Sequence, residues 1–90
     1  MRGRQASNKD KHGVLFEEAI TTFDDPFAMI APDPKHSVGE ERGWLIGEAD
    51  SGRILVSVYT MRGSVTRVIS ARPANHRERR IYEAFKRVPL

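Results

Sequence analysis

The chain has 90 residues, no cysteine and a formal net charge of +3 at pH 7. A chain of this length buries one small core, which predicts a single domain spanning residues 1–90. The lack of cysteine excludes disulfides, a thiolate nucleophile and Cys-ligated zinc, and it fits a reducing, cytoplasmic compartment. No apolar run approaches the ~20 residues of a membrane span, so we expect a soluble protein that is not exported and makes no membrane contact.

The charges are distributed unevenly along the chain. Residues 14–41 contain one basic and seven acidic residues, whereas residues 42–90 contain ten basic and four acidic residues. A basic half of this kind favours a polyanionic partner, with nucleic acid as the leading class. The alternative for any single arginine is a solvated surface position.

Two helices are predicted in the N-terminal third. Residues 4–12 are polar and give a weak helical pattern, which Gly13 is well placed to end. A second helix is predicted over residues 15–23 because apolar side chains recur at i, i+3, i+4 and i+7. Its buried face would be formed by Phe16, Ala19, Ile20 and Phe23, and its outer face by Glu17, Glu18, Thr21 and Thr22.

Four strands are expected next. The apolar run at residues 27–31 predicts a short strand, and the prolines and glycine of residues 32–41 predict an exposed loop. Residues 42–49, 53–62 and 65–72 then predict three strands of an antiparallel meander, because Asp50-Ser51-Gly52 and Gly63-Ser64 supply tight turns between them.

The middle strand of the meander alternates in polarity. Ile54, Val56 and Val58 share one face, whereas the other face carries Leu55, Ser57, Tyr59 and Met61. One face can therefore pack on helices while the other stays partly open for a ligand.

A final helix is predicted over residues 76–87. Asn75 followed by Glu78 has the spacing of a capping box, and the buried stripe would be formed by Ile81, Tyr82 and Phe85. Arg79 and Arg80 are then surface charges of this helix, whereas Arg67 and Arg72 belong to a strand and its exit.

The order of these segments resembles the BrnT family, the ribonuclease toxins of bacterial type II toxin-antitoxin pairs. The resemblance covers residues 8–83 and rests on "NKDKHGVLFEEAITTFDDP", "HSVGEERGWLIG", "YTMRG" and "TRVISARPANHRERRIYE". Members of the family begin with a strand of the type F-x-W-D, whereas this chain begins "MRGRQAS", so we expect that first strand to be missing or replaced.

The resemblance implies an α+β, RelE-like fold, in which N-terminal helices and a C-terminal helix accompany an antiparallel β-meander. It implies a toxin that cleaves RNA on the uncovered face of the sheet and so inhibits translation. It also implies a BrnA-like ribbon-helix-helix antitoxin as partner, with operator DNA bound only through the toxin–antitoxin complex.

Arginine suits metal-independent RNA cleavage, because its planar fork stays charged and binds two phosphate oxygens at once. Arg67 and Arg72 are the leading candidates, with Arg62 at the end of the middle strand as a third. Arg67 and Arg72 are five residues apart and would face opposite sides of a regular strand, so a bulge or the turn at Pro73 must reorient Arg72 if both are to reach one phosphate.

Proton transfer and RNA contacts have weaker candidates. Pattern alone interprets Lys11 and His12 as charges at a helix C-terminus, whereas the resemblance favours a functional role for both, with Lys11 as a phosphate clamp or a base. Glu18 is an exposed helix carboxylate, a residue that holds Lys11 or an arginine in place, or a proton acceptor. His76 is either a cap-region residue or a general acid, and Arg77 lies beside it as a candidate RNA contact. Tyr59 either stacks a base or belongs to the core.

No metal or other cofactor is predicted, because the three histidines and the carboxylates have no metal-binding spacing. Together with the resemblance, these residues leave two functions open. The first is a metal-independent endoribonuclease toxin, and the alternative is a non-catalytic, toxin-derived module that binds an antitoxin partner, nucleic acid or both.

Overall fold

The computed structural model describes residues 12–33 and 41–88. The elements in order are α2 (Phe16–Thr21), the 3₁₀ turn η1 (Thr22–Asp24), β1 (Met29–Pro32), β2 (Glu41–Glu48), β3 (Ile54–Arg62), β4 (Val65–Pro73) and α3 (His76–Arg87). The helix predicted over residues 4–12 lies almost wholly outside the described residues. Its predicted end is seen, because Gly13 has a φ of 70°.

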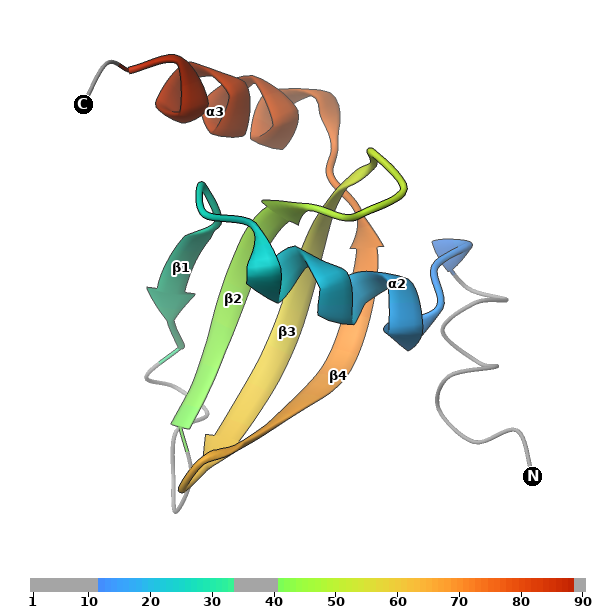
Figure 1. The fold of residues 1–90 in the computed structure, drawn as a ribbon, viewed down its shortest axis with the longest axis vertical. Coiled ribbons are helices and arrows are strands. Elements are labelled where there is room, and N and C mark those ends of the chain that lie inside the picture. Colours follow the sequence, from blue (N-terminus) through green and yellow to red (C-terminus); the bar gives the residue numbers. More distant parts are fainter. Residues whose placement is uncertain (1–11, 34–40, 89–90) are drawn as a thin grey trace.

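The four strands form one antiparallel sheet in the order β1-β2-β3-β4, which confirms the predicted meander (Figure 1). Each strand pairs with the next along the chain, so the sheet is built from local connections. β1 begins two residues later than predicted, because the side chain of Asp25 accepts a hydrogen bond from the Phe27 amide and holds residues 25–27 in a turn.

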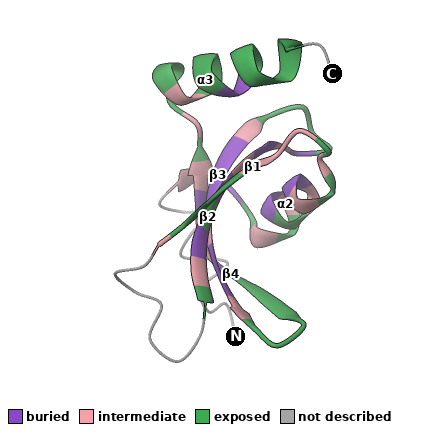
Figure 2. Cartoon of the chain, turned by 90° about the vertical axis from the view of Figure 1, so that its left-hand side faces the viewer, coloured by how far each residue is buried: buried purple, intermediate pink, exposed green. Residues whose placement is uncertain are grey.

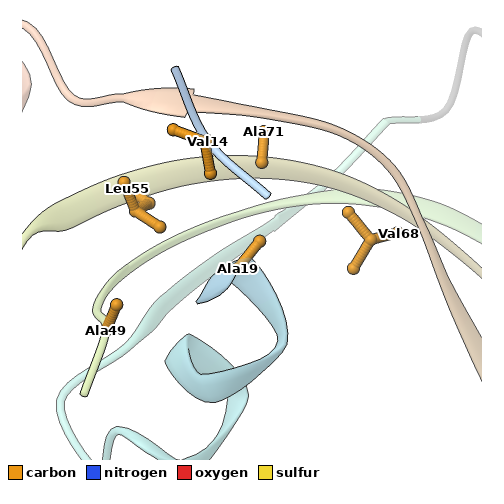
Figure 3. Close-up of a cluster of buried hydrophobic side chains, with 6 residues drawn as sticks. All are labelled: Val14, Ala19, Ala49, Leu55, Val68 and Ala71. Carbon is orange, nitrogen blue, oxygen red and sulfur yellow. The ribbon is translucent and has the colours of Figure 1, made fainter. Parts of the chain in front are cut away.

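The sheet has a covered face and an open face. α2 packs against one side of the sheet, and Figure 2 shows the opposite side without a described helix below the level of α3. The core lies between α2 and the covered face (Figure 3) and contains Val14, Ala19, Ala49, Leu55, Val68 and Ala71. The open face contains Arg42, Trp44 and Ile46 of β2, Val56, Val58, Thr60 and Arg62 of β3, and Val65, Arg67, Ser70 and Arg72 of β4.

The prediction for the second helix was partly wrong. α2 ends at Thr21 and the chain tightens into the 3₁₀ turn η1, which has a different periodicity. Ala19 of α2 and Thr22 of η1 are both fully buried, so Thr22, expected in solvent, belongs to the packed side, whereas Ile20 of α2, expected in the core, is 56% exposed. Burial of Thr22 is tolerated because its hydroxyl donates a hydrogen bond of 2.6 Å to the carbonyl of Ala19.

α3 crosses the end of the sheet where β2 ends and β3 begins (Figure 1). Its predicted capping box is present: the Glu78 amide donates to Asn75 Oδ1 over 2.8 Å, and the Asn75 amide donates to Glu78 Oε1 over 2.9 Å. Its predicted buried stripe was wrong in two of three positions, because Tyr82 is buried but Ile81 and Phe85 are each 48% exposed. The helix overhangs the small sheet, so only one narrow side of it finds a packing partner.

Candidate nucleic-acid interface

A β-bulge in β4 decides where its arginines lie. Val58 pairs with Ser70 and Tyr59 pairs with Val68, so Ile69 has no partner on β3. The extra residue shifts the alternation of side chains by one position. Arg67 and Arg72 therefore face the same side of the sheet. A bulge was one of the two ways in which we expected Arg72 to be reoriented.

A row of side chains runs across three strands of the open face. Thr60 of β3 pairs with Arg42 of β2 on one side and with Arg67 of β4 on the other. Side chains that are directly opposite in neighbouring strands lie about 5 Å apart at their Cβ atoms. Two guanidinium groups thus flank the buried Thr60 on one face, at the end of the sheet near the β3–β4 turn.

A pocket of about 310 Å³ lies beside this row and is lined by Thr60, Arg62, Val65 and Arg67. Arg62 and Arg67 are exposed. Within the described part of the chain, Arg67 has no hydrogen-bond or ion-pair partner. An exposed guanidinium without a partner beside a second arginine suits the binding of a phosphate. We call Arg42, Thr60, Arg62 and Arg67 the arginine cluster.

Arg72 shares the open face but lies apart from the arginine cluster. It pairs with Val56, which is four residues from Thr60 on β3, and four strand residues span about 13 Å. Its guanidinium binds Glu78 at both oxygens, with N–O distances of 2.7 Å. The hydrogen bonds from Arg72 lower the pKa of Glu78 to about 2, against burial, which raises it.

His12 and Glu18 do not reach the arginine cluster. Glu18 binds Arg53 Nε over 2.8 Å and Arg53 Nη2 over 2.5 Å, and Arg53 Nη2 also donates to the carbonyl of Gly13. Glu18 thus holds an arginine, as one prediction allowed, at the β2–β3 turn. Arg53 and Thr60 are seven residues apart along an extended chain, about 23 Å. Lys11 lies outside the described residues.

Three further candidates are spread over other parts of the molecule. His76 and Arg77 are exposed at the start of α3, beside a pocket of about 470 Å³ that Arg80, Ile81 and Ala84 complete. Tyr59 belongs to the core, as one of its two predicted roles had it: it is 9% exposed and contacts Phe23 edge-on, with ring centroids 5.5 Å apart. Gly43 leaves room for it, because a Cβ there would lie 2.7 Å from the Tyr59 hydroxyl.

The sequence reasoning missed Arg42. It stands at the start of β2, 25 residues before Arg67 in the sequence, and joins it only through the pairing of β2 and β4 with β3. The predicted meander contained the necessary signal, since counting back from each tight turn gives the strand register.

Other kinds of site find little support in the described residues. Among them, no three histidine, aspartate or glutamate side chains gather as a metal site would require. In the same part of the chain, no helix is long and apolar enough to cross a membrane.

A family model described as the ribonuclease toxin BrnT of type II toxin-antitoxin systems matches residues 2–78, which is more than half of the chain. The chain belongs to the BrnT family. A BrnT protein is a ribonuclease toxin of a type II toxin-antitoxin system, which implies an RNA substrate and an antitoxin partner. The observed α+β arrangement, with a four-stranded meander between an N-terminal and a C-terminal helix, is consistent with the RelE-like toxin fold. A search of the curated proteins found no match to this chain.

Proposed function

We propose that this BrnT protein is a metal-independent endoribonuclease that binds the scissile phosphate at the arginine cluster and inhibits translation by cutting RNA. The observation that carries the assignment is the row across the open face, which sets Arg42 and Arg67 on either side of Thr60. The pocket that Arg62 shares with Arg67 adds a third cation at the same end of the sheet.

In the proposed reaction the 2′-oxygen of one nucleotide attacks the adjacent phosphorus and the bond from phosphorus to the 5′-oxygen breaks. The products are a 2′,3′-cyclic phosphate and a 5′-hydroxyl, with the 2′-OH proton passing to water and water protonating the leaving oxygen. The arginines stabilise the charge that develops on the non-bridging oxygens, a contribution that typically accounts for about 10²–10³ in rate for one well-placed donor.

The first prediction concerns Arg67. Arg67→Ala should lower the cleavage rate about 100-fold in excess EDTA, because it removes an exposed guanidinium from the phosphate site. The measurement is cleavage of end-labelled RNA by antitoxin-free protein, with folding checked by circular dichroism. Arg79→Ala, an exposed arginine of α3, is the matched control and should cut at the wild-type rate. Equal cutting by the wild type and Arg67→Ala would contradict the proposal.

His12 and Glu18 have no proton-transfer role in this proposal, because the hydrogen bonds of Arg53 tie Gly13 and Glu18 to the opposite end of β3. His12→Ala should therefore cleave within about threefold of the wild type, since an essential general base typically accounts for 10²–10⁴ in rate. A loss of 100-fold or more would move the reaction centre towards the β2–β3 turn.

The partner is proposed to be a BrnA-like ribbon-helix-helix antitoxin, with operator DNA bound only by the complex. The support is the family, whose toxins act in pairs. The test is to co-express the chain with a ribbon-helix-helix protein encoded beside its gene, if one is found there, and to measure complex formation and promoter binding. A purified pair that fails to associate would contradict this part of the proposal.

A second candidate function is a non-catalytic module that binds RNA and an antitoxin. It is favoured by the lining of the cluster's pocket, in which the described residues are two arginines, Thr60 and Val65, with no histidine or carboxylate among them. The cleavage assay separates the two functions. RNA that binds in a salt-dependent manner but stays intact at every protein concentration, also with ribosomes present, would support the module.

A further inference from the structure

The open face carries an exposed tryptophan beside the arginine cluster. All seven aromatic residues of the chain fall within the described residues, and only Trp44 and Phe85 are exposed. Trp44 is 40% exposed and is the only aromatic on the open face of the sheet in the described part of the chain. A tryptophan that is 40% exposed beside cations is unusual in a small domain, whose core would gain from burying the whole indole.

The strand pairing fixes the position of Trp44 relative to the arginine cluster. Trp44 follows Arg42 by two residues on β2, so the two side chains lie on the same face about 7 Å apart along the strand. Its partners across the sheet are Ala31 of β1 and Val58 of β3. Both are smaller than the indole, so neither neighbour in this row is large enough to cover it.

We propose that Trp44 is a nucleobase-binding site, on which a base of single-stranded RNA stacks while the adjacent phosphate binds the arginine cluster. Proteins that bind single-stranded nucleic acid combine a basic groove with aromatic side chains in this way. The inference rests on the proposed function. It deepens that function by assigning the base contact to Trp44, whereas the sequence had offered Tyr59, which lies in the core.

Trp44 is the single tryptophan of the chain, so tryptophan fluorescence reports on this site alone. The probe is a 2′-O-methyl oligoribonucleotide, which binds but cannot be cleaved, and an abasic oligomer of equal length and charge is its control. We expect the oligoribonucleotide to quench the tryptophan fluorescence. The abasic oligomer should bind more weakly and leave the fluorescence unchanged.

Variants separate stacking from folding. Trp44→Ala should weaken binding of the 2′-O-methyl oligomer about tenfold, measured by anisotropy of an end-labelled strand, because stacking of one base contributes this much. Trp44→Phe should keep most of the affinity, since it retains an aromatic face. Ile20→Ala, at an exposed apolar residue of α2, should leave the affinity unchanged.

The outcomes distinguish this inference from the proposed function. Wild-type binding without quenching, together with full affinity of Trp44→Ala, would overturn the role of Trp44 while RNA binding stands. Equal losses in Trp44→Ala and Trp44→Phe, with both variants folded, would also overturn the stacking role. Failure of the wild type to bind RNA by anisotropy would overturn the proposed function itself, and the base site with it.

Discussion

At the scale of single residues, Arg67 and Arg72 show that two arginines of the same strand can have different roles. Arg72 binds Glu78 bidentately and joins the exit of β4 to the cap of α3. A phosphate would have to displace that carboxylate to reach it. Arg67 is exposed in a pocket with Arg62 and is the more available cation. We therefore propose that Arg72 stabilises the fold and that Arg67 binds RNA.

The ion pair of Arg72 predicts a pH dependence of stability. The pKa of Glu78 is about 2 in the folded protein and 4.5 ordinarily. The ion pair therefore stabilises the folded protein above about pH 4.5, and this stabilisation is lost as the pH falls towards 2. Glu78→Gln keeps the capping geometry but removes the charge, and it should lower the free energy of unfolding at pH 7 by about 1–2 kcal/mol after solvent screening.

The measurement is urea unfolding of the wild type and Glu78→Gln at pH 7 and at pH 2.5. We expect the difference between the two proteins to shrink at the lower pH, because at pH 2.5 Glu78 is largely protonated in the unfolded chain and partly protonated in the folded protein, so most of its charge stabilisation is lost. A difference that stays constant between the two pH values would show that the carboxylate charge does not stabilise the fold.

At the scale of elements, α3 is attached by polar contacts more than by apolar packing. Tyr82 donates a hydrogen bond to Asp25, and Lys86 Nζ lies 2.9 Å from Glu48 Oε1. Asp25 also accepts from the amides of Glu48 and Phe27. Burial acts to raise the pKa of Asp25, but these hydrogen bonds outweigh it and lower the pKa overall. The carboxylate of Asp25 thus connects the end of η1, the end of β2 and α3.

Tyr82→Phe tests this attachment. The substitution keeps the buried ring and removes only the hydrogen bond to Asp25, so it should lower the free energy of unfolding by about 1–2 kcal/mol. The measurement is denaturant unfolding, with amide exchange of α3 as a local readout. Faster exchange confined to α3 is the expected result. Phe85→Leu, at an exposed position of the same helix, is the control and should change little.

At the scale of the whole molecule, charge is separated between the two sides of the sheet. The acidic residues Glu17 and Glu18 lie on α2 against the covered face, whereas Arg42, Arg62 and Arg67 lie on the open face. Glu18 is paired with Arg53, so a polyanion is attracted to the arginines of the open face more than to the helix side.

The separation of charge predicts a salt dependence. If three arginines contact phosphates, the logarithm of the RNA-binding constant should fall with the logarithm of salt concentration with a slope of about −2, since each contact to a single strand contributes about −0.7. Arg67→Ala should reduce the slope by about 0.7, whereas Trp44→Ala should weaken binding without changing it. Slopes that are equal in the wild type and Arg67→Ala would remove Arg67 from the phosphate site.

The sequence by itself determined the features that depend on neighbouring residues. Asn75 and Glu78 predicted the cap of α3, and the turns at residues 50–52 and 63–64 predicted the meander, because capping and tight turns use residues only a few positions apart. The quoted segments also indicated the family, which the match over residues 2–78 confirmed.

Only the tertiary structure decided which side chains share a surface. The bulge at Ile69 turned Arg67 and Arg72 to one face, and the register of three strands placed Arg42 in line with Arg67. Phe23 of η1 packs on Tyr59 on the covered face, whereas Trp44 stays exposed on the open face. These outcomes depend on pairing and packing between residues that are far apart in the sequence, whereas a strand's own alternation specifies only that two faces exist.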